Sequence, residues 1–140
     1  MEPVWITGMG LITSIGNDRS SVLESLRDMK HGIESPTMLQ VEESPVKVAG
    51  TVKEFDVDSS DPEDWIYPSK YRVPRATLRS FSPHVLYAWC ALQQAIEDAN
   101  LSEEEIQDPG SGLYTSSGGS MSSIHKHFEK MDRRGVMACN

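Results

Sequence analysis

The chain has few cysteines and no apolar stretch long enough to cross a membrane. Cys90 and Cys139 are the only two cysteines, too few for the disulfide framework of a small secreted protein. No apolar run approaches the roughly 20 residues of a membrane-spanning helix, and Met1-Glu2-Pro3 is not the basic start of a signal peptide. These absences predict a cytoplasmic protein with no membrane partner.

Positively charged residues are outnumbered in this chain. Lysine and arginine together number 13, against 21 aspartate and glutamate residues, which gives a net charge of −8. We do not expect so acidic a chain to bind nucleic acid, because the phosphate backbone would repel it. The 140 residues, of which 38% are hydrophobic and 24% charged, suit one soluble domain spanning residues 1–140.

The charges are distributed unevenly along the chain. Acidic residues form one block over residues 54–64 and another over residues 97–108, and residues 65–96 contain no acid. Eight of the 13 lysines and arginines form two groups, which are Lys70, Arg72, Arg75 and Arg79 in the middle of the chain and Lys126, Lys130, Arg133 and Arg134 near its end. Most charge runs are solvated faces, so this interpretation holds unless another observation favours binding.

The stretch from Val4 to Gly16 carries the clearest local pattern. An apolar, partly β-branched run predicts a buried strand over residues 3–8. Gly8 and Gly10 allow the backbone to turn where a Cβ would clash, and Gly16-Asn17-Asp18 can open a helix. A strand, a glycine turn and a helix start in this order predict an α/β fold.

The same glycines could begin a dinucleotide-binding turn. Gly8-Met9-Gly10 supplies the opening of the G-x-G-x-x-G fingerprint, but Thr13 stands where the third glycine belongs. No strand ending in an acidic residue follows at about 20 residues to hold a ribose. A core strand followed by a turn explains the pattern better, and we expect no cofactor.

Hydrophobic periodicity and turn residues predict helices near residues 18–31, 83–99 and 120–134, and strands near residues 3–8, 46–52 and 112–116. The central helix is the best defined, since Ser82 can cap it and Pro83 suits its first turn. Its expected apolar face consists of Val85, Trp89, Leu92 and Ile96, with Ala88, Ala95 and Ala99 beside them for close packing. Asn100 can end the helix in a left-handed conformation.

The ends of the other elements follow from similar signals. Asn17 or Ser20 can cap the first helix, and Gly32 can end it. Gly135 can end the last helix. Residues 53–80 contain several prolines and are predicted to be irregular, and so long an irregular segment inside a domain is usually functional.

The side chains most often used in catalysis and metal binding form no recognisable constellation. The four histidines are His31, His84, His125 and His127, and no Cys/His group has the spacing of a zinc site. His125 and His127 would face different sides of one helix and cannot hold one metal together. A solvated or capping role is expected for each histidine, a buried apolar role for Cys90, and no metal site.

Several segments, in this order, resemble the β-ketoacyl-acyl-carrier-protein synthases, the decarboxylating condensing enzymes of fatty-acid and polyketide synthesis. The matching segments include residues 4–17, Ala49-Gly50-Thr51-Val52, Ala95-Ile96-Glu97-Asp98-Ala99-Asn100-Leu101 and Ser116-Ser117-Gly118-Gly119-Ser120. Arg79 and the Gly118-Gly119-Ser120 turn look closer to the type I synthases than to type II. The resemblance implies the N-terminal part of a thiolase-like layered α/β/α fold, which as an incomplete fold should expose apolar surface. Residues 56–74 are longer and more acidic than is typical of the family.

The resemblance also implies an activity whose catalytic groups this chain lacks. The family joins an acyl group to malonyl-acyl-carrier protein with loss of CO₂, using a cysteine at a helix N-terminus and two later histidines. Met137-Ala138-Cys139 echoes the cysteine motif, but it comes only one short helix after Gly118-Gly119, too early for the nucleophile. We therefore expect a fragment that is inactive alone, from an enzyme that is a homodimer when complete. The alternative is a non-catalytic partner resembling a chain-length factor, or a stand-alone binding module.

Two groups of site residues follow from the resemblance, and none of them is catalytic. Gly118, Gly119 and Ser120 correspond to the family's acyl pocket, where glycine leaves room for the acyl chain, although a plain tight turn would need the same residues. Four arginines correspond to the basic patch that receives the acidic acyl carrier protein, namely Arg75, Arg79, Arg133 and Arg134. A basic patch within an acidic chain suits the steering of an acidic partner.

Overall fold

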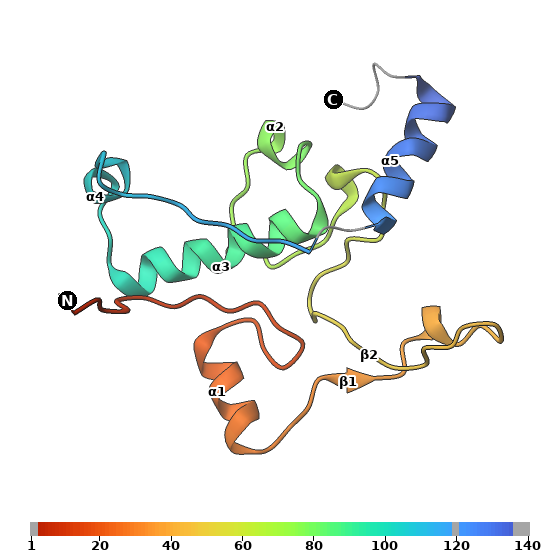
Figure 1. The fold of residues 1–140 in the computed structure, drawn as a ribbon, viewed down its shortest axis with the longest axis horizontal. Helices are drawn as coiled ribbons and strands as arrows, with labels where there is room; N and C mark the ends of the chain where they lie inside the picture. Colours follow the sequence, from red (N-terminus) through yellow and green to blue (C-terminus); the bar gives the residue numbers. More distant parts are fainter. Residues whose placement is uncertain (1–2, 119–120, 136–140) are drawn as a thin grey trace. The chain divides into compact units, whose positions relative to one another are not determined.

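The computed structural model describes residues 3–118 and 121–135, with no side-chain description for residues 121–123. In chain order its elements are α1 (Arg19–Arg27), β1 (Ile33–Glu34), η1 (Thr37–Leu39), β2 (Ala49–Gly50), η2 (Pro62–Asp64), α2 (Arg75–Leu78), α3 (Pro83–Ala99), α4 (Glu103–Gln107) and α5 (Met121–Arg134), where η marks a 3₁₀ helix (Figure 1). The chain forms two compact units: unit 1 consists of residues Met1–Glu54 and Ala88–Asn100, and unit 2 of Phe55–Tyr87 and Leu101–Asn140. Helices together with a small sheet make it a mixed α/β chain.

Only one of the three predicted strands contributes to a sheet in the described part of the chain. β1 and β2 pair antiparallel, with Ile33 opposite Gly50 and Glu34 opposite Ala49, so the strand predicted over 46–52 is reduced to two residues. The strands predicted over 3–8 and 112–116 were wrong, because within the described residues neither segment has a neighbour to complete a ladder. An extended apolar segment becomes a strand only when a second segment pairs with its backbone.

Helix α1 is shorter than predicted and has a different cap. Asp18 is the N-cap, and its carboxylate accepts a hydrogen bond from the Ser21 N–H at 2.8 Å. The Ser21 hydroxyl lies 3.3 Å from the Asp18 N–H in return, which completes a capping box. The helix ends before Gly32, because Met29 already takes a left-handed conformation with φ of 54°.

Helix α3 has the predicted bounds, Pro83–Ala99, and Asn100 follows it with φ of 52°, as predicted. Its most buried side chains are Leu86 and Cys90, which are fully enclosed one turn apart. The buried apolar role predicted for Cys90 is confirmed. The predicted apolar face was rotated slightly from the real one, since Val85 is 43% exposed.

Gly8 and Gly10 are required for close packing on α3. An ideal Cβ on Gly8 would lie 2.3 Å from the Ala95 carbonyl oxygen, and one on Gly10 would lie 1.8 Å from that of Ala91. Neither glycine has a positive φ, so the predicted role in a turn is replaced by a role in backbone-to-helix contact. Packing against α3 therefore explains why glycine stands at both positions, without a bound nucleotide.

Polar side chains of α3 complete the attachment in unit 1. The Met9 N–H donates to the Asp98 carboxylate at 3.0 Å, and the Leu11 N–H donates to the Gln94 side-chain oxygen at 3.1 Å. The amide nitrogen of Gln94 donates to the Asn17 carbonyl oxygen at 2.8 Å. Backbone groups that no strand partner satisfies are thus satisfied by helix side chains.

Unit 2 is built mostly from irregular chain, as predicted for residues 53–80. A backbone bridge joins Asp56 and Ile66 through hydrogen bonds of 2.8 and 2.9 Å, and the indole N–H of Trp65 donates to the Ser59 carbonyl oxygen at 2.9 Å. Phe55 packs edge-on against Tyr87 with ring centroids 5.2 Å apart. These contacts shape the loop that carries η2.

The C-terminal helices differ in how well the sequence predicted them. Helix α4 was missed, although Ser102 and Glu105 form its capping box with the S-x-x-E spacing. Helix α5 matches the prediction, and Gly135 ends it with φ of 78° and an N–H that donates to the Met131 carbonyl oxygen at 2.8 Å.

The structure exposes apolar side chains, as expected of an incomplete fold. In unit 1, Val4, Trp5 and Ile6 are 95%, 79% and 85% exposed. In unit 2, Leu113 and Tyr114 are 69% and 97% exposed. Both groups lie on the segments that were predicted as strands. Within residues 3–118 and 121–135, no helix combines the length and the apolar character needed to cross a bilayer.

Candidate docking surface and cavity

Two of the predicted docking arginines share one carboxylate in unit 2. Arg75 is the first residue of α2 and Arg79 is its C-cap, one turn later, so the two side chains can project toward the same side. The Arg75 Nη2 atom lies 3.1 Å from one oxygen of Glu63, and the Arg79 Nε atom lies 2.6 Å from the other oxygen. We call these three residues the Glu63 clamp.

The backbone around Glu63 is fixed by its own contacts. The Asp61 side chain caps η2 and accepts a hydrogen bond from the Glu63 N–H at 3.1 Å. Pro62 is buried beside it. The carboxylate is 24% exposed, whereas the side chains of Arg75 and Arg79 are 80% and 64% exposed. The carboxylate is therefore the anchored member of the clamp, and the arginines remain accessible to solvent.

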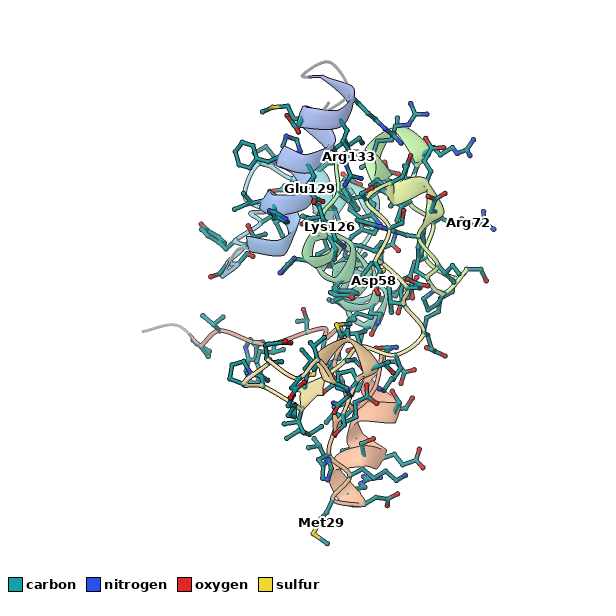
Figure 2. All side chains as sticks on the ribbon, turned by 90° about the vertical axis from the view of Figure 1, so that its right-hand side faces the viewer. Met29, Asp58, Arg72, Lys126, Glu129 and Arg133 are labelled. Carbon is teal, nitrogen blue, oxygen red and sulfur yellow. The ribbon has the colours of Figure 1, made fainter. Side chains whose placement is uncertain are left out.

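Basic residues also follow one face of α5. Lys126, Lys130, Arg133 and Arg134 have the spacing i, i+4, i+7 and i+8, which places them along one side of a helix; we call them the α5 basic stripe. Figure 2 shows Lys126 and Arg133 spaced along this helix together with Glu129. Arg133 and Arg134 stand in the last turn, where a positive charge also stabilises the helix dipole.

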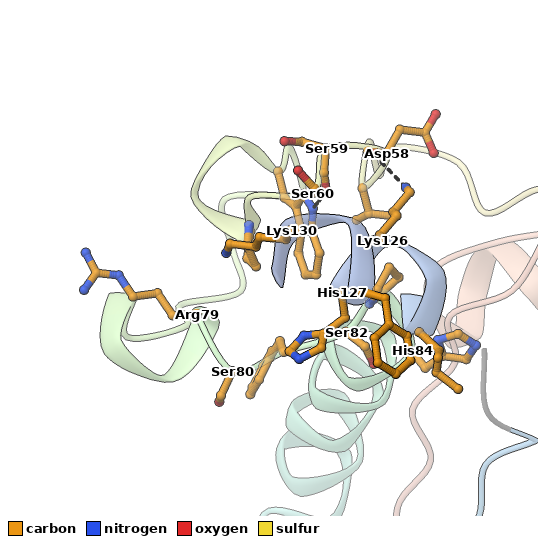
Figure 3. A pocket seen from close by; sticks show the side chains of 17 residues that line it. Asp58, Ser59, Ser60, Arg79, Ser80, Ser82, His84, Lys126, His127 and Lys130 are labelled. Atoms are coloured by element: carbon orange, nitrogen blue, oxygen red, sulfur yellow. Dashed lines mark hydrogen bonds between the residues drawn. The ribbon is translucent and has the colours of Figure 1, made fainter. Parts of the chain in front are cut away.

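A cavity of about 740 Å³ lies within unit 2, and the clamp and the stripe each contribute to its walls. Its lining comes from the loop before η2, from the segment between α2 and α3, and from α5 (Figure 3). Trp65, Phe81 and Phe128 supply apolar surface, and the titratable lining residues are one acid, Asp58, and five basic residues, Arg79, His84, Lys126, His127 and Lys130. The cavity therefore combines aromatic walls with groups that favour a negative charge.

The acidic block over residues 54–64 borders this basic wall. The Lys126 ammonium donates a hydrogen bond to the Asp58 carbonyl oxygen at 2.7 Å. Figure 3 shows the Asp58 carboxylate directed away from the other labelled side chains. The Arg79 guanidinium also points away from them, to the left of the view (Figure 3). Arg79 thus lines the cavity with its stem while its charged end meets Glu63 outside.

The pKa of Tyr87 in unit 2 is raised. Burial raises the pKa of the half-buried Tyr87 phenol, and the negative charge of Asp58 raises this pKa further. The phenol therefore stays neutral over a wider pH range than an ordinary tyrosine.

Among the described site residues that were predicted, one lines the cavity and the others do not. Arg79 reaches the cavity, whereas Arg75, Arg133 and Arg134 are exposed and do not line it. Gly118 is exposed and has no atom within 4 Å of an ideal Cβ, so the structure leaves open space beside it. Gly119, Ser120 and Cys139 lie outside the described residues.

The four histidines do not all lie at one place. His31 is exposed, and His84 and His127 line the cavity. His125 instead has its Nε2 atom 3.6 Å from a Glu129 oxygen, one turn along α5. Among the described residues no three histidine, cysteine, aspartate or glutamate side chains are grouped to hold a metal ion.

Sequence reasoning missed the role of Glu63 and the contribution of Lys126 and Lys130 to the cavity. Glu63 belongs to the acidic block that was noted only as a charge run, and its partners lie 12 and 16 residues away in irregular chain. Lys126 and Lys130 were noted as basic, but no pattern in the sequence indicated that they face a cavity.

Comparisons with known proteins identify the family. The family profile "Beta-ketoacyl synthase, N-terminal domain" matches residues 1–139. The 3-oxoacyl-[acyl-carrier-protein] synthase 1 of Haemophilus influenzae is 33% identical, with 99% of this chain and 31% of the relative covered. Synthase 1 of Escherichia coli K12 is 36% identical, covering 85% of this chain and 26% of the relative. Synthase 2 of Staphylococcus aureus strain COL is 28% identical, covering 93% and 29%.

The comparisons cover most of this chain but only a small part of each relative. The chain spans less than a third of the length of the curated relatives that it matches. The matched part includes both units and all the predicted site residues, since it extends over residues 1–139. The chain therefore belongs to the β-ketoacyl synthase family, and residues 1–139 correspond to its N-terminal domain.

Proposed function

We propose that this chain is the N-terminal part of a 3-oxoacyl-[acyl-carrier-protein] synthase. The observation that carries the proposal is the family match over residues 1–139, together with relatives that bear this name. In the proposed reaction, malonyl-acyl-carrier protein loses CO₂, and the resulting carbanion attacks an acyl group held as a cysteine thioester. A carbon–carbon bond forms and the thiolate leaves, so the product is a 3-oxoacyl-acyl-carrier protein.

The cysteine that carries the acyl group is supplied by a part of the protein other than residues 1–140. Cys90 is fully buried inside α3, which makes it unsuitable as a nucleophile. We further propose that the whole protein has the layered α/β/α architecture, forms a homodimer and works in the cytoplasm. The exposed apolar segments around Val4 and Tyr114 are surfaces that further strands of such a sheet would cover.

A chimera tests the activity directly. Residues 1–140 replace the matching part of the Escherichia coli relative, and the product is assayed with an acyl donor and malonyl-acyl-carrier protein. We expect the chimera to form 3-oxoacyl product and CO₂, and the 140-residue chain alone to form none. A folded but inactive chimera would favour the alternative, a non-catalytic partner resembling a chain-length factor or a stand-alone binding module.

We propose that Gly118, Gly119 and Ser120 border the acyl chain of the substrate. Gly118 is exposed, and no atom lies within 4 Å of an ideal Cβ there, so a substrate could approach it. In the chimera, Gly119→Ile should shorten the longest acyl chain accepted, since isoleucine has a bulk that glycine lacks. An unchanged product profile would refute the assignment. The same profile would also indicate whether fatty acids or polyketide intermediates are the preferred substrates.

We propose that Arg75, Arg79, Arg133 and Arg134 dock the acyl carrier protein, which is acidic. Two observations support this surface. All four arginines are exposed, and Arg79 lines one cavity together with Lys126 and Lys130 of the α5 basic stripe. A positive surface on a chain of net charge −8 steers an acidic partner to one place while the rest of the chain repels it.

A further inference from the structure

The Glu63 clamp places an acidic side chain where the proposed acidic partner would bind. Each oxygen of the Glu63 carboxylate meets a different arginine, at 3.1 Å for Arg75 and 2.6 Å for Arg79. Glu63 therefore uses the same donors that a partner's carboxylate would use. Three charges within the clamp sum to +1, whereas the two arginines alone would present +2.

We infer that Glu63 sets how strongly this surface binds an acidic partner, by occupying Arg75 and Arg79 in the unbound chain. The inference rests on the proposed docking function and adds a residue that limits its affinity. A partner carboxylate must displace Glu63 or share the arginines with it, so part of the binding free energy is spent on opening the clamp.

The geometry makes this competition reversible. Both arginines are mostly exposed, and exposed ion pairs contribute little to stability because water and salt compete with them. Glu63 is held in place by the capped turn of η2, so it stays close to the arginines after they are released. A tethered but weak competitor lowers affinity by a moderate factor without closing the surface.

The test compares Glu63→Gln with a matched variant in the same turn. Asp64→Asn removes an equal charge one residue away, and among the described residues Asp64 accepts a hydrogen bond from Ser59 and makes no ion pair. Binding is measured by fluorescence anisotropy at low ionic strength, with two probes: apo acyl carrier protein and a labelled peptide of glutamates. Thermal melts by circular dichroism check that each variant folds, and Glu63→Ala serves as a second variant.

We expect Glu63→Gln to bind both probes about three- to tenfold more tightly, since two exposed pairs of modest strength are removed. Asp64→Asn should change the affinity by less than about twofold, because it removes only a screened long-range repulsion. In a chain that already carries Arg75→Gln and Arg79→Gln, the Glu63 substitution should have no effect.

Two results would overturn the inference. In the first, Glu63→Gln binds the peptide no more tightly than Asp64→Asn does. In the second, Glu63→Gln binds the peptide more weakly than the natural chain does. Weaker binding would mean that Glu63 orients the arginines for the partner. Failure of the proposed docking function gives a different pattern, in which the carrier binds neither form while the peptide still binds Glu63→Gln more tightly.

Discussion

The contacts inside unit 1 and those inside unit 2 include different kinds of interaction. In unit 1, the backbone at Gly8 and Gly10 approaches α3 so closely that a methyl group would collide with it. In unit 2, the contacts around the cavity are ion pairs, loop hydrogen bonds and one edge-on pair of aromatic rings. The contact of Gly8 and Gly10 with α3 therefore depends on shape, which salt cannot weaken, whereas the Glu63 clamp of unit 2 depends on charges that salt can screen.

This difference corresponds to a difference in the proposed roles. Close packing against α3 suits a scaffold, because a well-packed region has one arrangement. Exposed charges on a partly irregular framework suit a surface that must exchange its own contacts for those of a partner. All four arginines of the proposed docking surface belong to unit 2.

The largest effect is expected from adding one methyl group in unit 1. Gly10→Ala places a Cβ 1.8 Å from the Ala91 carbonyl oxygen, so the backbone or the helix must move. We expect the free energy of unfolding to fall by about 2–3 kcal/mol, measured by urea denaturation of the 140-residue chain. The matched control in unit 2 is Gly118→Ala, which meets no atom within 4 Å and should change stability by less than about 0.5 kcal/mol. Equal effects at both glycines would remove the contrast.

A smaller loss of stability is expected from the cap of α1. Asp18→Ala removes the carboxylate that accepts the Ser21 N–H, so one helix-terminal donor loses its partner. We expect a cost of about 1 kcal/mol in the same urea experiment. Ser20→Ala is the control, since among the described residues its hydroxyl donates to the Asp18 side chain and caps no backbone group. A cost for Asp18→Ala no greater than the control's would mean that packing alone determines the start of α1.

The smallest predicted effect concerns pH and belongs to unit 2. Because the folded pKa of Tyr87 is raised, its contribution to stability is complete below the unfolded tyrosine pKa of about 10 and is lost as pH rises through the folded pKa. Tyr87→Phe should therefore flatten the decline of stability above pH 10, measured by urea denaturation at several pH values. A decline that is identical in Tyr87→Phe would show that other groups cause it.

Unit 1 has a titrating group that acts at the opposite end of the pH scale. Lys53 and Thr51 lower the pKa of Glu34 through hydrogen bonds to its carboxylate. Its contribution is therefore present above the unfolded glutamate pKa and is lost as pH falls through the folded pKa. The Tyr87 substitution should leave this acid side of the stability profile unchanged.

The elements that the sequence predicted well are those whose signals are local. Helix α3 has its cap, its first-turn proline and its left-handed last residue within one stretch of chain, and its bounds were predicted correctly. The segments over 3–8 and 112–116 also contain apolar residues typical of strands, yet a strand depends on a partner that their own residues cannot reveal. Gly8 and Gly10 were recognised as special, but their neighbour, α3, lies more than 80 residues away in sequence.

The same distinction applies to the candidate site. Arg79 was predicted as a docking residue from its place in a family pattern, and this role stays a prediction, although its side chain lines the cavity. Glu63 was missed because ion pairing across irregular chain leaves no periodic trace. The acidic block could have indicated it, since a negative run followed by a positive run in one chain can pair internally.

The docking of an acyl carrier protein is the central claim, and its ionic-strength dependence is the most direct test. Stopped-flow association is measured for the natural chain, for Arg79→Glu combined with Arg134→Glu, and for the control Arg27→Glu, an exposed arginine in the last turn of α1. We predict that the double variant associates about tenfold or more slowly at low salt, that the difference shrinks as salt rises, and that the control behaves like the natural chain. Equal association rates for the double variant and the natural chain at low ionic strength would contradict the claim.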